Sequence, residues 1–202
     1  MHATICDFIA DCLQNSVEAN STHIKFLYEK KGNIISAIIE DNGKGMTKEQ
    51  LEKVRDPFYT DGTKHVKRKV GLGIPFLLHS LNLSGGKFDI QSEKGVGTKV
   101  EFSFDTSNID TPPEGDISFA VLQAMMFDGD YELEFVRTQS PELVSGNSSE
   151  GSLGGSGHDQ YVIKRSELLD VLGDINSAES INLARQYFKS HEENLNKEAG
   201  NG

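Results

Sequence analysis

The sequence predicts an α/β fold, because segments with helical periodicity and segments with strand periodicity follow one another along a chain of 202 residues. Near the N-terminus, apolar residues recur at helical spacing, whereas in 98–104 they alternate with polar residues as in a half-buried strand. Hydrophobic residues make up 36% of the chain and include eleven Phe, which is enough to form a core. The length fits one domain with an appendage.

The first half of the chain is expected to contain three helices and four strands. The first helix covers about 3–19, and Thr47 with Gln50 forms a capping box for a short second helix that ends before Pro57. The third helix follows Gly73 and ends near Gly85. The expected strands are 24–28, 34–40, 88–91 and 98–104. Since the second strand is apolar on both faces, it should lie in the middle of the sheet.

The second half adds shorter elements. A helix is expected over 116–127, followed by strands at 131–135 and 161–164. Ser166 should cap a short helix that Gly173 ends, and a last helix should run from Asn176 to His191. The predicted organisation is 1–105 as the main domain, 106–137 as a helix–strand extension, 138–160 as a flexible Ser/Gly-rich loop, 161–195 as a strand–helix–helix segment, and 196–202 as a disordered tail.

Composition excludes several classes of function. A formal net charge of -11 argues against a nucleic-acid surface and against docking on an anionic membrane. No stretch approaches the roughly 18 apolar residues of a spanning helix, and the N-terminus lacks the features of a signal peptide, so we expect a cytoplasmic protein. Cys6 and Cys12 match no metal or redox spacing and are expected in the core.

Four short segments carry the candidate chemistry. On the first helix, Asp11 and Asn15 stand one turn apart, so a carboxylate and a hard amide ligand for Mg²⁺ point the same way. The second segment begins with Asp41 after an apolar strand and continues with glycines that permit a sharp turn. The other two are Gly71-Leu72-Gly73 at a helix start, where phosphates bind readily, and Gly95-Val96-Gly97-Thr98. Each alone also fits a solvated helix face or an ordinary turn.

Together and in this order, the four segments resemble the N-box, G1, G2 and G3 motifs of the GHKL (Bergerat-fold) ATPases, the superfamily of histidine kinases, gyrase B, MutL and the ninety-kilodalton heat-shock chaperones. Asp56-Pro57-Phe58 also resembles the histidine-kinase F-box. The resemblance covers about 1–105. It implies a two-layer sandwich, with a mixed, mainly antiparallel sheet and helices on one face, plus a small C-terminal α/β extension.

The resemblance also implies roles for individual residues, with ATP and Mg²⁺ as cofactors. Asp41 would accept the adenine amino group, helped by Thr98 through a water. Asn15 would hold Mg²⁺, and Asp11 stands where many relatives carry the Glu that activates water. The ATP-binding set implied is Asn15, Ala19, Asp41, Gly43, Gly45, Met46, Lys69, Gly71, Leu72, Gly73 and Thr98.

Two positions depart from the family pattern. Lys69 replaces an additional glycine of the G2 segment, where it would contact phosphate or stiffen the lid, and Asp11 is one methylene shorter than Glu. Hydrolysis is therefore less firmly implied than binding. The Asp-Pro-Phe segment, the Lys69–Pro75 segment and the tail from Ser166 to Asp174 further resemble a small stand-alone ATPase-domain family of anaerobic bacteria, encoded beside iron-only hydrogenases.

Three functions remain open at this stage. Only fourteen residues precede Asn15, so we expect no phosphoacceptor hairpin, and none of the six His has an acceptor-like context. A trans-acting kinase-like regulator would phosphorylate a separate, possibly hydrogenase-related, protein partner. The alternatives are an ATP-hydrolysing conformational switch and a nucleotide-sensing interaction module without turnover. The F-box and the short lid favour the kinase-like reading.

Overall fold

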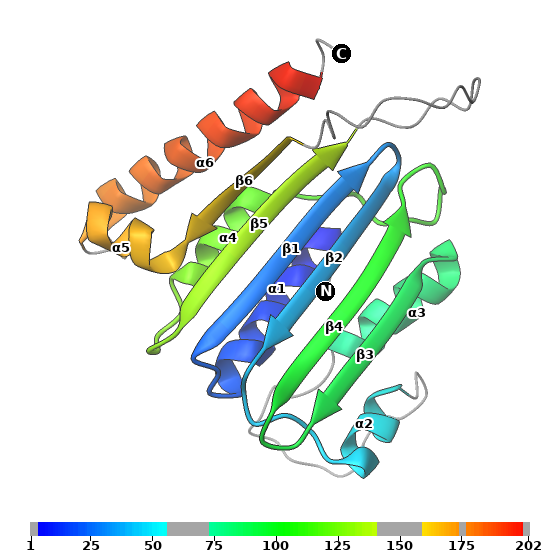
Figure 1. Cartoon of the computed structure of the whole chain (residues 1–202). Helices are drawn as coiled ribbons and strands as arrows, with labels where there is room; N and C mark the ends of the chain where they lie inside the picture. Colours follow the sequence, from blue (N-terminus) through cyan, green and yellow to red (C-terminus); the bar gives the residue numbers. More distant parts are fainter. Residues whose placement is uncertain (1–3, 56–72, 141–158, 174–176, 200–202) are drawn as a thin grey trace, which may run out of the picture.

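The computed structural model describes residues 4–55, 73–140, 159–173 and 177–199, which form a mixed sheet with helices on one face (Figure 1). The strands are β1 (His23–Lys31), β2 (Ile34–Asp41), β3 (Lys87–Glu93), β4 (Gly97–Asp105), β5 (Glu132–Ser140) and β6 (Asp159–Lys164). Their order in the sheet is β3-β4-β2-β1-β5-β6. Every neighbouring pair is antiparallel except β1 with β5, which is parallel. The predicted fold class, including the central place of the second strand, is confirmed.

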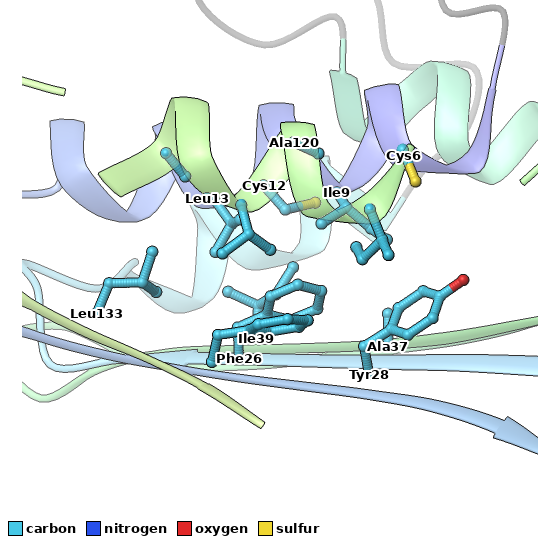
Figure 2. Packing of buried hydrophobic residues seen from close by; sticks show 14 of the residues in the cluster. Cys6, Ile9, Cys12, Leu13, Phe26, Tyr28, Ala37, Ile39, Ala120 and Leu133 are labelled. Carbon is cyan, nitrogen blue, oxygen red and sulfur yellow. The ribbon is translucent and has the colours of Figure 1, made fainter. Parts of the chain in front are cut away.

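The described helices are α1 (Ile5–Glu18), α2 (Lys48–Arg55), α3 (Gly73–Ser84), α4 (Ile117–Met125), α5 (Arg165–Leu172) and α6 (Ala178–Ala199). In the view of Figure 1, α1, α3 and α4 lie behind the sheet, whereas α5 and α6 lie beside its β6 edge and α2 lies near the end of β3. Figure 2 shows α1 and α4 facing the sheet, with Ile9 and Leu13 pointing down at Phe26 and Ile39. Because Phe26 is completely buried, its burial stabilises the fold by about 1.5–3 kcal/mol.

Helix starts follow local hydrogen-bonding chemistry. The predicted capping box of α2 is confirmed, because the Thr47 amide donates to Gln50 Oε1 at 2.9 Å and the Gln50 amide donates to Thr47 Oγ1 at 3.3 Å. The expected cap at Ser166 is wrong. The helix begins two residues earlier than such a cap implies, at Arg165, and the cap position is taken by Lys164, whose side chain makes no capping hydrogen bond. The Ser166 amide donates instead to Glu132 Oε1 at 3.2 Å. Gly173 ends α5 with a positive φ of 67°, as expected.

The second half of the chain extends the same sheet. β5 pairs with β1 over its whole length, and β6 then pairs with β5. Both strands reach into 138–160, the stretch predicted to be a flexible loop, since β5 continues to Ser140 and β6 begins at Asp159; residues 141–158 lie outside the described residues. Similarly, α6 continues to Ala199, into the stretch predicted to be a disordered tail.

A buried polar network ties α6 to the sheet. Arg137, only 2% exposed, forms an ion pair with Glu192 at 3.2 Å and lies over the Tyr28 ring, with its Cζ atom 4.8 Å from the ring centroid. The Tyr161 hydroxyl donates to the same Glu192 oxygen at 2.6 Å, and the Tyr28 hydroxyl donates to Glu114 at 2.7 Å. The charge of Arg137 is therefore balanced inside the protein rather than by water.

The described helices range from eight to 22 residues in length. None of them combines the length and the apolar character that a bilayer crossing requires.

Cys6 and Cys12 are buried, as expected, and burial raises the pKa of each thiol to about 12. Such thiols stay protonated at neutral pH and act as small core residues.

Candidate functional site

The carboxylate of Asp41, at the end of β2, is held by three donors. Oδ2 accepts a hydrogen bond from the Ser16 hydroxyl at 2.9 Å. Oδ1 accepts from the Gly43 amide at 2.9 Å and from the Ser21 hydroxyl at 3.2 Å, whose single proton is shared with the closer Ser16 carbonyl oxygen at 2.6 Å. A carboxylate offers about four acceptor sites, so these bonds fix the group and leave about one site for an outside donor. The arrangement suits recognition of a ligand N–H group.

The loop after Asp41 is pressed against the end of α1. The Lys44 amide donates to the Ala19 carbonyl oxygen at 2.9 Å. Gly43 is buried, and a Cβ there would lie 2.5 Å from Ser21 Oγ and 2.7 Å from Ala19 Cβ. Gly45 has a φ of 57°, and a Cβ there would overlap the carbonyl of Glu93. Both positions therefore require glycine, one for close approach and the other for its backbone conformation as well.

Asn42 has a structural role beside this carboxylate. Its Oδ1 atom accepts from the amides of Thr22 and His23, each at 2.9 Å, and its Nδ2 atom donates to Thr22 Oγ1 at 2.9 Å. The side chain thereby ties the end of β2 to the start of β1 and keeps Asp41 directed toward the helical layer.

Ser92 connects the second and fourth sequence segments. Its hydroxyl accepts from the Met46 amide at 2.9 Å and donates to the Gly97 carbonyl oxygen at 2.9 Å. Thr98 Oγ1 lies 2.9 Å from the same hydroxyl oxygen, and with the Ser92 proton on Gly97 the Thr98 hydroxyl is the donor. Thr98 is also paired with Asp41 in the β2–β4 register, so the two lie on adjacent strands.

Asp11 and Gly73 meet where α1 passes the start of α3. A Cβ on Gly73 would lie 2.6 Å from Asp11 Oδ2, so only glycine allows this approach. A carboxylate at a helix N-terminus is electrostatically favourable. Asp11 is half-buried, whereas Asn15, one turn further along α1, is exposed.

The structure thus groups most of the predicted residues along α1. Ala19, Asp41, Gly43, Gly45, Met46 and Thr98 are linked around its C-terminal end, while Asp11 and Gly73 meet nearer its middle. Lys69, Gly71 and Leu72 lie outside the described residues, as does the Asp56-Pro57-Phe58 segment.

Sequence reasoning missed Ser16, Ser21 and Ser92. Ser16 follows Asn15 directly and lies one turn beyond Cys12, so its position on the inner side of α1 was available from helical spacing. Ser21 and Ser92 lack such a signal, because their partners are 20 or more residues away or on another strand.

A hollow of about 890 Å³ opens at this end of the sheet. Asp41, Gly97 and Thr98 reach it, but the rest of its lining includes side chains of the open sheet face, such as Lys25 and Glu40. Asp11 and Asn15 do not line it. In the described ranges, no three His, Cys, Asp or Glu side chains group as a metal site, so the assignment of Mg²⁺ to Asn15 stays a prediction.

Comparison with known proteins places this geometry in context. The family model of the histidine kinase-, DNA gyrase B- and HSP90-like ATPases matches residues 3–108. The sensor histidine kinase YvrG of Bacillus subtilis is 29% identical over 99 residues, which are 48% of this chain and 17% of that protein. The alginate biosynthesis sensor protein KinB of Pseudomonas aeruginosa is 27% identical over 95 residues, 47% of this chain and 15% of that protein.

Among solved structures, the N-terminal domain of a DNA repair protein superposes with a TM-score of 0.49 at 11% identity, covering 80% of this chain and 52% of the other. The chain spans less than a fifth of the length of the two curated relatives. The matched segment 3–108 contains α1 to β4, and with them every residue of the site described above.

Proposed function

The chain belongs to the family of histidine kinase-, DNA gyrase B- and HSP90-like ATPases, and from this premise we propose that it is a Mg²⁺- and ATP-dependent, kinase-like regulator that acts on a separate protein. Its nucleotide-binding part is an ATPase domain of the histidine-kinase type. The phosphoacceptor would be a protein partner, and the resemblance in the tail region makes a hydrogenase-related partner the first to test.

The observation that carries the proposal is the set of hydrogen bonds that hold the Asp41 carboxylate. Three internal donors fix its carboxylate as an acceptor, and the 6-amino group of adenine supplies the donor that its remaining site requires. Thr98, on the adjacent strand, would reach the base through water. Ala19 and Met46 supply apolar surface beside the turn, and Gly43 and Gly45 let that turn approach closely.

The phosphates and the metal are assigned to the part of α1 between Asp11 and Asn15. Asn15 presents an exposed amide, and an amide oxygen is a hard donor of the kind that Mg²⁺ takes. Bound Mg²⁺ would neutralise phosphate charge. Gly71, Leu72 and Gly73 would bring backbone N–H groups to the phosphates, and Lys69 would add a positive charge.

Asp11 is the proposed catalytic residue. Its carboxylate lies beside Gly73 at the start of α3, next to the segment assigned to the phosphates. In the kinase-like function it would accept the proton of a partner's attacking group. In the alternative function, an ATP-hydrolysing switch, the same carboxylate would accept the proton of water. A module that only senses nucleotide would use neither.

The test follows ATP labelled on its γ-phosphate. The purified chain is incubated with Mg²⁺ and this ATP, with and without cell extract, while bound nucleotide, free phosphate and labelled protein are measured. We expect ATP to bind, little phosphate to be released without extract, and label to pass to an extract protein. Asp11→Ala should retain binding and lose transfer.

Two other outcomes of this test would assign one of the alternative functions. Steady phosphate release that Asp11→Ala abolishes would assign the hydrolytic switch instead, and binding without release or transfer would assign the sensor module.

Asp41→Asn should lose ATP binding, because a buried contact of this kind contributes about 1–3 kcal/mol. Asp110→Asn, at an exposed loop position, is the matched control. Undiminished ATP binding by Asp41→Asn would contradict the adenine assignment.

A further inference from the structure

The open face of the sheet, turned toward the viewer in Figure 1, carries an apolar row across four neighbouring strands. Each of β6, β5, β1 and β2 contributes one residue, and the strand register places them side by side: Val162, Val136, Leu27 and Ile38. None of the four belongs to the buried core, and Val162 is 42% exposed. In Figure 1, none of the six described helices crosses this face of the sheet.

A row of alternating charge runs parallel to the apolar row. It consists of the residues two positions away on the same strands: Lys164, Glu134, Lys25 and Glu40. Within the chain, Lys25 and Lys164 both approach Glu134, at 3.7 and 3.9 Å. Such exposed pairs contribute little to folding, so they leave the row available to an outside partner.

Both rows have the same centre, which lies between β1 and β5. These two strands are parallel, and β2 and β6 flank them in the opposite direction. A twofold rotation about an axis that runs along the strands exchanges β1 with β5 and β2 with β6. It therefore leaves the pattern of strand directions unchanged. Under that rotation the charge row is complementary to itself. Lys25 faces Glu134 of a second copy, and Glu40 faces Lys164 of that copy.

We propose that this face is the interface of a homodimer, in which the two sheets pack face to face about this axis. The apolar rows then coincide, because Leu27 faces Val136 of the second copy and Ile38 faces Val162. His23 and Glu132, which are paired in register at the end of the same strands, place an imidazole opposite a carboxylate across the interface. Aligned packing of this kind is common between sheets.

Other arrangements of two copies lack this complementarity. A twofold axis across the strands would keep Leu27 on Leu27 and would pair Lys25 with Glu29. It would, however, leave the other three charges of the row over the polar residues Thr138, Ser36 and Gln160. A shift by one strand would place like charges together. The charge pattern therefore selects one axis, and a second copy is the occupant that carries the matching surface.

The interface area sets the expected affinity. The strands β1 and β5 have nine residues each, β2 has eight and β6 has six. With about 4.8 Å between strands and a rise of about 3.3 Å per residue, they cover roughly 510 Å² per copy. This is below the roughly 800 Å² per partner of a standard interface, so the dimer should be weak and concentration-dependent. Two strands, β3 and β4, would overhang on each side and stay accessible.

The test uses charge-swapped variants of the full chain in sedimentation velocity from about 1 to 100 µM. One variant carries Lys25→Glu and Lys164→Glu, so that its row is entirely acidic. The other carries Glu40→Lys and Glu134→Lys, so that its row is entirely basic. We expect the wild type to dimerise in this range, each variant alone to dimerise at least about tenfold more weakly, and the mixture to recover dimers.

A second pair of variants distinguishes loss of dimerisation from loss of folding. Leu27→Glu places a charge in the apolar row on the open face and should weaken dimerisation about tenfold with an unchanged far-ultraviolet circular dichroism spectrum. Leu83→Glu, at an exposed apolar position of α3 in the helical layer, should leave dimerisation unchanged. A wild type that stays monomeric, variants that still dimerise, or a mixture that does not recover would each overturn the proposed interface.

Discussion

The hydroxyl of Ser16 donates a hydrogen bond to Oδ2 of Asp41 at 2.9 Å, and this bond joins the inner face of α1 to the end of β2. Ser21 donates to the other oxygen of the same carboxylate. One serine on α1 and one in the connection between α1 and β1 therefore orient the acceptor to which adenine recognition is assigned. The orientation of this carboxylate has consequences that binding measurements can detect.

Ser16→Ala should weaken ATP binding about tenfold, since a hydrogen bond to a charged group contributes about 1.5 kcal/mol. Ser21→Ala should weaken it less, because the Ser21 proton is shared with the Ser16 carbonyl oxygen. Inosine triphosphate, which carries an oxygen in place of the adenine amino group, should be affected much less. The ratio of the two affinities, measured by calorimetry, is the readout. Ser166→Ala, at an exposed position on α5, is the control. Equal losses for both nucleotides would contradict an orienting role.

Asn15→Asp should weaken binding of Mg²⁺-ATP much more than binding of metal-free ATP, because the substitution changes the proposed metal ligand and adds negative charge near the phosphates. Gln14→Glu makes the same chemical change at the preceding exposed residue of α1 and should have a small effect on both. Titrations with Mg²⁺ and with a chelator separate the two forms of ATP. A similar loss in both titrations would exclude Asn15 as the ligand.

Gly97→Ala should destabilise the protein by more than about 2 kcal/mol, because its φ is 145° and a Cβ would overlap the carbonyl of Asp41. Gly95→Ala, two residues earlier, has a φ of 81° with no atom within 4 Å of the added Cβ, so only the backbone cost of about 1 kcal/mol applies. Urea unfolding monitors both. Comparable losses of unfolding free energy in the two variants would contradict overlap with the Asp41 carbonyl as the cause.

Glu192→Ala should cost about 2–3 kcal/mol of stability, because it leaves Arg137 buried without its ionic partner. The cost is below the roughly 3–5 kcal/mol for a fully buried pair, since the Glu192 side chain is 22% exposed. Glu193→Ala removes an exposed partner of Lys189 and should cost less than about 0.5 kcal/mol. The two variants change adjacent glutamates, and thermal unfolding measures the difference between their stabilities.

Stability should fall as the pH rises above about 10, because burial and the Glu114 carboxylate raise the pKa of Tyr28 above its ordinary value. Between the unfolded and folded pKa values the folded state holds the proton and the unfolded state does not, so unfolding is favoured by about 1.4 kcal/mol per pH unit for this group. Tyr28→Phe should reduce the slope accordingly. Tyr187→Phe, at an exposed ring, is the control. An unchanged slope in Tyr28→Phe would contradict this cause.

Features set by neighbours in sequence could be predicted, and features set by distant contacts could not. The capping box at Thr47 and Gln50 depends on residues three apart, and the expected strands and helices follow periodicity within one segment. The cap at Ser166 failed because the backbone of α5 begins where β6 ends, and that position is fixed by pairing with β5. Local chemistry gave no sign of this.

The candidate site divides in the same way. Asp41, Gly43 and Gly45 stand together in the sequence, so their turn was visible, whereas the support from Ser21 and Ser92 depends on contacts across the fold. The parallel pairing of β1 with β5 was equally hidden, because strand periodicity does not specify a neighbour.

That parallel pairing has a consequence for how the protein is made. β1 acquires its second neighbour only when Glu132 and the residues after it have been synthesised, roughly one hundred residues after β1 itself. Until then, the whole edge of β1 is an unpaired template for other strands. A fragment cut at 105 would keep that edge open permanently, so during synthesis the nascent nucleotide-binding half depends on the late-arriving strand for protection from aggregation.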